Sequence, residues 1–239
     1  METTLDLWRQ PLERVPASVW ERGELRVLIL ADTGIRVLPP DIGRLRRLRT
    51  LDLGHNALSD LPDEIGDLTG LTDCLYLHDN RLTRLPASLG RLRALRYLNI
   101  GENPLAELPA ALGELEQLTE LRAQHNGLTA LPEALGRLGE LRELWLRGNA
   151  LTGLPDTFAG LAELRHLELR ENSLGHIPYA LAGLPLLRHL DLRANRIAAL
   201  PDWLPRMPAL EKLDLRWNGL DPGAPPLAAL EERGCVVLT

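Results

Sequence analysis

The chain has 239 residues, carries a formal net charge of −6, and is 45% hydrophobic but only 4% aromatic. This acidic balance argues against a nucleic-acid partner, because binding a phosphate backbone requires a basic stripe. No stretch approaches the roughly 18 consecutive apolar residues of a membrane-spanning helix, so no membrane partner is expected either.

Two residue series run in phase along the chain. An asparagine recurs every 23 or 24 residues and closes a Leu-x-x-Leu-x-Leu-x-x-Asn frame, as in Leu141, Leu144, Leu146 and Asn149. Repetition at such a period is typical of a solenoid, in which each unit contacts only its neighbours. The two series are Asn56, Asn80, Asn103, Asn126, Asn149, Asn172, Asn195 and Asn218, and Pro16, Pro39, Pro62, Pro86, Pro109, Pro132, Pro155, Pro178 and Pro201.

The repeats divide the chain without a linker, so we predict one domain over residues 1–239. Residues 1–24 form a degenerate N-terminal capping repeat, and residues 25–220 form about nine repeats of 23–24 residues. Residues 221–239 form a C-terminal cap, in which residues 227–233 are expected to be a short helix ended by Gly234, followed by a last strand. Such a cap covers apolar surface that an open solenoid end exposes.

One unit is irregular. The segment 71–75 holds one residue more than the corresponding segment of the other repeats. Because a one-residue slip would turn the strand inside out, we expect a bulge just before Leu75.

The sequence of one repeat, residues 141–163, indicates how each repeat folds. Leu144 and Leu146 alternate with polar or exposed positions, which indicates a strand with one buried face. The Asn149 amide can bond backbone groups that the following turn leaves unpaired. Pro155 fixes φ and removes a donor, so the returning wall should contain short 3₁₀ or irregular turns rather than a long helix. Closely spaced parallel strands facing a wider wall bend the stack into an arc.

The unit, with its Leu-Pro-x-x-Leu-Gly-x-Leu return, resembles the leucine-rich repeat family over roughly nine-tenths of the chain. The form it is similar to is common in intracellular bacterial proteins and in plant intracellular Ras-group leucine-rich repeat proteins. The resemblance implies an α/β solenoid with a parallel concave sheet and a convex side of short turns. It also implies a protein-binding module that usually uses the concave sheet.

The exposed strand positions flank the inward-facing leucines, and their side chains do not pack in the core. Aromatic residues and arginines gather near the middle of the arc, which is the composition of interface hot spots. The alternative is that large side chains fill this face without a partner. The predicted partner-binding residues are Tyr76, Tyr97, Asn99, Arg122, Trp145, Arg147, Glu168 and Arg170.

An arginine column continues through the C-terminal half, as Arg147, Arg170, Arg193 and Arg216, beside acidic residues. Two interpretations stay open: a self-satisfied network of surface ion pairs, each worth about 0–1 kcal/mol, or a surface that orients an acidic partner.

Evidence for chemistry is sparse. His166 and His189, with Glu168 and Asp191 alongside, could bind zinc, but nothing fixes a tetrahedron on an open face. The remaining histidines are interpreted as scattered, solvated turn residues: His55, His78, His125 and His176. No phosphate-binding loop, nucleophile elbow or zinc-protease motif occurs. We therefore predict no metal, no cofactor and no enzymatic activity.

The location follows from the termini and thiols. The segment from Met1 to Asp6 contains neither a basic nor an apolar stretch, so no secretory signal is expected. Cys74 and Cys235 lie too many strand spacings of about 4.8 Å apart for a disulfide. The expectation is a cytoplasmic, monomeric scaffold for a protein partner. The alternative is a regulatory subunit that docks on a signalling enzyme such as a small GTPase.

Overall fold

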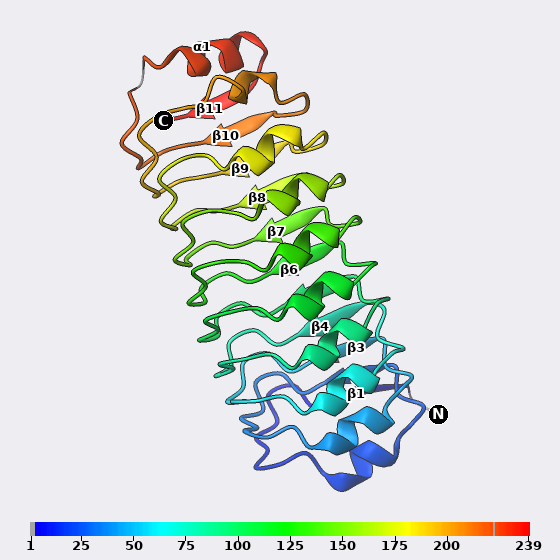
Figure 1. Ribbon diagram of the computed structural model, residues 1–239. Helices are drawn as coiled ribbons and strands as arrows, with labels where there is room; N and C mark the ends of the chain where they lie inside the picture. Colours follow the sequence, from blue (N-terminus) through cyan, green and yellow to red (C-terminus); the bar gives the residue numbers. More distant parts are fainter. Residues whose placement is uncertain (1–2, 222) are drawn as a thin grey trace.

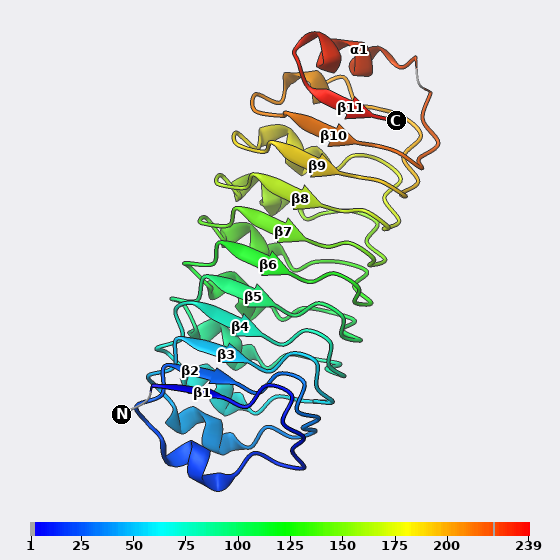
Figure 2. The ribbon, with the colours of Figure 1, turned by 180° about the vertical axis from the view of Figure 1, so that it is seen from behind.

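The computed structural model describes residues 3–221 and 223–239, and it forms an elongated stack of similar turns (Figures 1 and 2). One parallel sheet runs through the whole stack, with its strands in sequence order. This is the predicted leucine-rich repeat type of α/β solenoid. The strands are β1 (Thr4–Asp6), β2 (Val27–Ile29), β3 (Thr50–Asp52), β4 (Cys74–Tyr76), β5 (Tyr97–Asn99), β6 (Glu120–Arg122), β7 (Glu143–Trp145), β8 (His166–Glu168), β9 (His189–Asp191), β10 (Lys212–Asp214) and β11 (Val236–Leu238).

The opposite wall consists of short 3₁₀ turns, as predicted. Each of the first eight begins directly after a proline of the ladder, for example Pro132 before η6. The fixed φ of proline starts the turn and keeps it from extending into a long helix. The turns are η1 (Ala17–Glu21), η2 (Pro40–Arg44), η3 (Asp63–Asp67), η4 (Ala87–Arg91), η5 (Ala110–Glu114), η6 (Glu133–Arg137), η7 (Asp156–Gly160), η8 (Tyr179–Gly183) and η9 (Leu204–Arg206).

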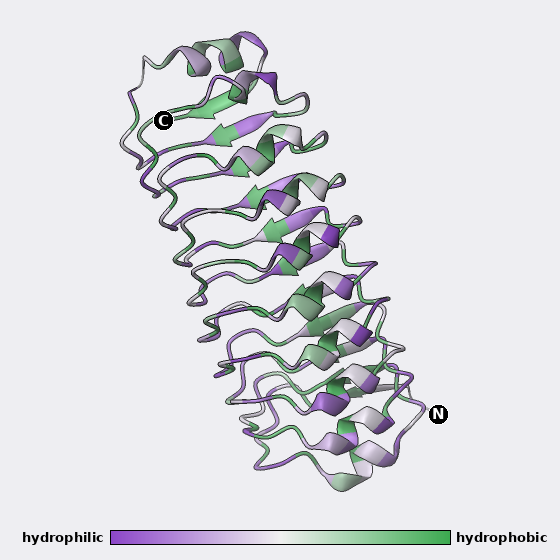
Figure 3. Ribbon diagram, viewed as in Figure 1, coloured by the Kyte–Doolittle hydropathy of each residue, from purple (hydrophilic) through white to green (hydrophobic). Residues whose placement is uncertain are grey.

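Leucine fills the space between the two walls. The central strand leucines Leu98, Leu121 and Leu144 are at most 1% exposed, and Phe158 from the opposite wall is fully buried. Figure 3 shows the apolar positions recurring at the same places in successive repeats. Ala123 replaces a larger residue and is also fully buried, so the core is continuous there but thinner.

The asparagine side chains tie each repeat to the preceding one. Asn103, 3% exposed, donates from Nδ2 to the carbonyl oxygens of Leu77 and Ile100, both at 3.1 Å. Its Oδ1 accepts the backbone N–H of Leu82 at 3.1 Å. The residue before it, Glu102, has a φ of 57°, a left-handed conformation that recurs before most ladder asparagines. The ladder therefore satisfies buried backbone groups that the turn leaves unpaired, as the sequence predicted.

The extra residue of the irregular repeat lies upstream of the strand. Asp73 and Cys74 both donate their backbone N–H groups to the Arg49 oxygen, at 2.9 and 3.3 Å, the pattern that the preceding repeat shows one period earlier. The pairing of β3 with β4 is regular. The additional residue is therefore Thr72, and the expected bulge just before Leu75 is wrong: the turn before the strand absorbs the residue, where no ladder is disturbed.

The C-terminal cap contains the expected helix and strand. Helix α1 (Pro225–Glu232) buries Leu227 and Leu230 against the core. Gly234 follows with a φ of 85°, and β11 then adds the last strand. No helix among residues 3–221 and 223–239 has the length and apolar character needed to cross a membrane. Both cysteines are free thiols.

Replacing Asn103 by leucine should lower the free energy of unfolding by about 1–3 kcal/mol, because it keeps the branching of the side chain but leaves buried carbonyl and N–H groups without partners. Denaturant unfolding measures the effect. Gln117→Leu is the matched control, because Gln117 is exposed, and it should change stability by at most about 0.5 kcal/mol. Equal effects of the two substitutions would contradict the role of the ladder.

Candidate functional site

The eight predicted partner-binding residues lie on one face of the sheet. Tyr76, Asn99, Arg122, Trp145 and Glu168 are directly paired across β4 to β8. Because side chains alternate along a strand, all of them point away from the leucine core. The first residue of β5 is Tyr97, and the two arginines, Arg147 and Arg170, follow β7 and β8 by two positions.

An aromatic strip crosses the middle of this face; we define it as Tyr76, Tyr97, Arg122, Trp145 and His166. The rings of Tyr76 and Tyr97 are 5.0 Å apart. The Arg122 guanidinium lies over Tyr97 at 5.8 Å and over Trp145 at 4.8 Å, and His166 stacks on Trp145 at 4.5 Å. Such cation–π and stacked contacts hold the side chains in fixed positions before any partner arrives.

Two glutamates brace the strip from the neighbouring column. The Arg122 Nε donates to Glu120 Oε1 at 2.6 Å, and the Trp145 Nε1 donates to Glu143 Oε2 at 3.2 Å. Both glutamates are the first residues of their strands, two positions before the group that they orient. The sequence gave no sign that these two glutamates hold the strip.

Burial sets the charge state of the strip. It raises the pKa of the Tyr97 phenol, and burial together with a hydrogen bond to Cys74 raises the pKa of Tyr76. Burial lowers the pKa of His166, whose buried Nε2 has no hydrogen-bond partner among the described residues. At neutral pH the two phenols and this imidazole are therefore uncharged, and Arg122 supplies the positive charge of the strip.

Asn99 differs from the other predicted residues. It is only 7% exposed, and its Oδ1 accepts the backbone N–H of Gly101 at 3.1 Å. Its side chain therefore shapes the turn after β5 and presents little surface.

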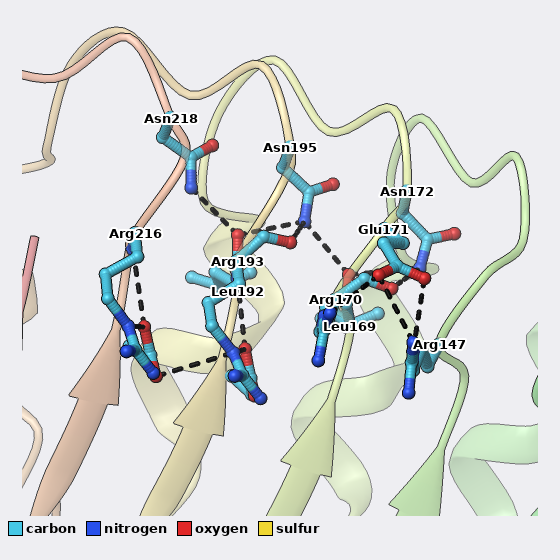
Figure 4. A network of polar contacts seen from close by, with 12 residues as sticks. Arg147, Leu169, Arg170, Glu171, Asn172, Leu192, Arg193, Asn195, Arg216 and Asn218 are labelled. Atoms are coloured by element: carbon cyan, nitrogen blue, oxygen red, sulfur yellow. Dashed lines mark hydrogen bonds and ion pairs between the residues drawn. The ribbon is translucent and has the colours of Figure 1, made fainter.

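The C-terminal arginine column is a network of ion pairs (Figure 4). Arg147 donates to Glu171 from Nε and from a terminal nitrogen, at 3.1 and 3.3 Å, and Arg170 lies 2.9 Å from the same carboxylate. Further along, Arg216 pairs with Asp214 at 2.7 Å. Arg193 completes the network by pairing with Asp191 and Asp214. Of the two open interpretations, the geometry favours the self-satisfied network, so these arginines are poor candidates for orienting an acidic partner.

A shallow cavity of about 330 Å³ lies where the strip meets this network. Two polar atoms of its lining are buried without a hydrogen bond in the described structure, Gln124 Oε1 and Arg170 Nε. The lining consists of Glu102, Arg122, Gln124, His125, Trp145, Arg147, Glu168, Arg170 and Arg193.

Glu168 is a charged residue of this face without a direct polar partner in the described structure. It is 9% exposed, and no hydrogen bond or ion pair within 4.0 Å is present for it among residues 3–221 and 223–239. Burial, with a contribution from Asp191, raises the pKa of its carboxyl group. Arg193, Arg147 and Arg170 act in the opposite direction but do not outweigh burial, so the folded protein disfavours the ionised carboxyl group.

The structure corrects the interpretation of several residues beside the site. Cys74 stands on the same face, a position that the irregular repeat had obscured. His55 and His78, interpreted as scattered turn residues, are in contact, with their Nε2 atoms 3.2 Å apart. The rings of His166 and His189 are 5.7 Å apart, and the described residues contain no group of three potential metal ligands.

Two sequence-family profiles match the chain. A profile described as leucine rich repeat matches residues 74–128, 118–174 and 139–197, which together span 124 of the 239 residues. A second profile, described as leucine-rich repeat region, matches residues 15–95.

Curated and solved proteins show the same repeat. The volume-regulated anion channel subunit LRRC8A of Rattus norvegicus is 37% identical over 82 residues, which are 34% of this chain and 10% of that protein. The chain therefore matches only about a tenth of the length of that relative.

Two solved structures share the fold over nearly the whole chain. The leucine-rich repeat protein LIC12759 of Leptospira interrogans is 27% identical with a TM-score of 0.66, over 98% of this chain and 77% of the other. The ectodomain of the plant receptor kinase GASSHO1/SCHENGEN3 of Arabidopsis thaliana, solved in complex with CASPARIAN STRIP INTEGRITY FACTOR 2, is 30% identical with a TM-score of 0.79, over 91% of this chain and 27% of the other.

Replacing Glu168 by glutamine should raise the free energy of unfolding at pH 7 by about 1 kcal/mol, because it removes a buried, unpaired charge. Because the folded-state pKa of Glu168 is raised, folding favours the protonated carboxyl group. The ionised group therefore lowers the free energy of unfolding of the wild-type protein at neutral pH, and this loss shrinks as the carboxyl group protonates. The gain should therefore fall as the pH is lowered from 7 toward about 4.

Denaturant unfolding at several pH values measures this dependence. Glu107→Gln, the same change at an exposed position of the opposite wall, is the control and should show little gain. A loss of stability at pH 7 in Glu168→Gln would show that the surrounding arginines more than compensate the burial.

Proposed function

The chain belongs to the leucine-rich repeat family, and we propose that it is a non-enzymatic scaffold that binds a protein partner on its concave face. The observation that carries this proposal is the aromatic strip, a set of large side chains in the centre of the face that is fixed by stacking rather than by burial. Aromatic residues and arginine contribute most of the binding energy in protein interfaces, particularly near the centre.

The pre-organised state of the strip supports the proposal further. Ordering flexible side chains on binding costs about 0.5–1.5 kcal/mol each, and Arg122 and Trp145 are already held by Glu120 and Glu143. The shallow cavity beside the strip gives room for a side chain of the partner. The similar plant ectodomain was solved in complex with CASPARIAN STRIP INTEGRITY FACTOR 2, which supports a binding role.

The location and oligomeric state are part of the proposal. Free thiols at Cys74 and Cys235 are compatible with a reducing compartment, and we propose a cytoplasmic monomer similar to the intracellular bacterial and Ras-group members of the family. The C-terminal ion-pair network keeps much of the remaining face internally satisfied. The partner is therefore expected to centre on the strip rather than on the arginine column.

Truncating Trp145 to alanine should weaken partner binding by about 2 kcal/mol or more, because the indole is the largest central contact. Folding should change little, since the residue points away from the core. The partner is first captured from the source cell, and affinities of the variants are then measured by calorimetry.

Arg216→Ala is the control at the edge of the same face, where Asp214 already pairs with the arginine. It should cost well under 1 kcal/mol. A larger loss at Arg216 than at Trp145 would move the site to the arginine column, and no loss at either would exclude the concave face.

A further inference from the structure

Two histidines from neighbouring repeats meet beside the N-terminal end of the aromatic strip. His55 follows β3 in a left-handed turn with a φ of 53°, and His78 follows β4 by two residues. Their Nε2 atoms are 3.2 Å apart, and the rings stand edge to face with centroids 4.6 Å apart. The His78 ring lies 6.0 Å from Tyr76, so the pair adjoins the strip.

A glycine makes this meeting possible. A Cβ at Gly54 would lie 2.5 Å from the His78 Cε1, so any side chain there would displace the ring. The absence of a side chain lets His78 lie across the preceding repeat, where His55 stands. Gly101 lets the Gln124 side chain lie across its repeat in the same way, and at Gly54 the arrangement brings two imidazole rings together.

The second nitrogen of His55 is held by a carboxylate. The distance from His55 Nδ1 to Asp79 Oδ2 is 2.7 Å. When Nδ1–H donates to this carboxylate, the lone pair of the neutral ring is on Nε2, the atom that faces His78. A histidine that ligates a metal commonly donates its other N–H to a carboxylate in this way, which fixes both tautomer and ring orientation.

The ring of His78 is half-buried. The Nδ1 atom of His78 is buried and has no hydrogen-bond partner among the described residues. In the metal-free pair the His78 Nε2–H donates to the lone pair of His55 Nε2, so a metal ion bound there takes the place of this proton, which moves to Nδ1.

We propose that His55 and His78 bind one Zn²⁺ ion through their Nε2 atoms, with Asp79 as the carboxylate that orients His55. Tetrahedral zinc with Zn–N bonds of about 2.0–2.1 Å separates two nitrogen ligands by about 3.3 Å, close to the distance observed here. The site does not depend on the proposed partner-binding function, and it differs from the histidine pair that the sequence suggested, His166 and His189.

The protein supplies two of the four ligands that tetrahedral zinc takes. The His55 side chain is 53% exposed, so the other two coordination positions face solvent. Water fills them in the free protein. A histidine, cysteine or carboxylate of a partner docked on the adjacent strip can replace that water.

Zinc titration of the chelator-treated, reduced protein tests this site directly. All variants carry Cys74→Ser, so that the thiol on the concave face cannot bind the added metal. Calorimetry gives the stoichiometry, and the histidine ring signals in ¹H–¹³C NMR spectra identify the ligands. The expected result is one ion per chain and zinc-dependent shifts of the His55 and His78 signals, while the His125 and His176 signals stay in place.

The variants then separate ligands from bystanders. His55→Gln and His78→Gln should each weaken binding at least about tenfold, and Asp79→Asn by about tenfold. His125 occupies the turn position that corresponds to His55 three repeats along, and His125→Gln should bind zinc as the parent does. No zinc binding by the parent, or binding that both His55→Gln and His78→Gln retain, would overturn the proposal.

Discussion

The structure depends on one recurring interaction, the hydrogen bonds of a buried asparagine amide with the backbone of its own repeat and of the preceding one. Each ladder amide reaches a carbonyl three residues before it and the equivalent carbonyl one repeat earlier, as Asn172 does with Leu169 and Leu146. The left-handed residue that precedes most ladder asparagines turns the chain so that the amide points inward. These bonds replace water for backbone groups at the end of each strand, which a leucine could not do.

The ladder determines what the concave face can become. Because every repeat is joined to the next in the same register, equivalent side chains form straight columns across the sheet. A column of arginines then forms ion pairs with the neighbouring column of acidic residues, as Arg193 and Arg216 do with Asp191 and Asp214. Near the middle of the sheet, rings from two different columns stack instead, as Trp145 does with His166. The difference between the C-terminal ion-pair network and the central strip is thus a difference of residue type on one unchanging backbone.

Much of the fold could be predicted because each of its elements corresponds to a residue pattern that recurs in the sequence. The alternation around Leu144 and Leu146 indicates a strand, the ladder prolines indicate short turns, and Gly234 marks the end of the cap helix; the structure contains all of these features. The position of the extra residue in the irregular repeat was predicted incorrectly. The sequence shows that one residue is added but does not show which part of the backbone accommodates it. The turn at Thr72 accommodates the extra residue at a lower energetic cost, because no strand pairing is lost there.

The candidate site was predictable only as a set of positions. The columns place Tyr97, Arg122 and Trp145 on the exposed face, but rotamers decide which neighbours they contact. The sequence likewise gave no sign of the meeting of His55 with His78, which depends on the missing side chain of Gly54 and on a left-handed turn. Side-chain partners on an open surface are set by small differences in geometry that a repeat pattern does not encode.

Site-specific photo-crosslinking tests the central claim, that the aromatic strip is the surface that meets the protein partner. A photoreactive phenylalanine derivative replaces Tyr97 in the strip or Tyr179 on the opposite wall, where the side chain is 74% exposed. The account predicts a crosslinked partner from position 97 and none from position 179. Crosslinking from position 179 alone would place the interface on the convex wall and contradict the account.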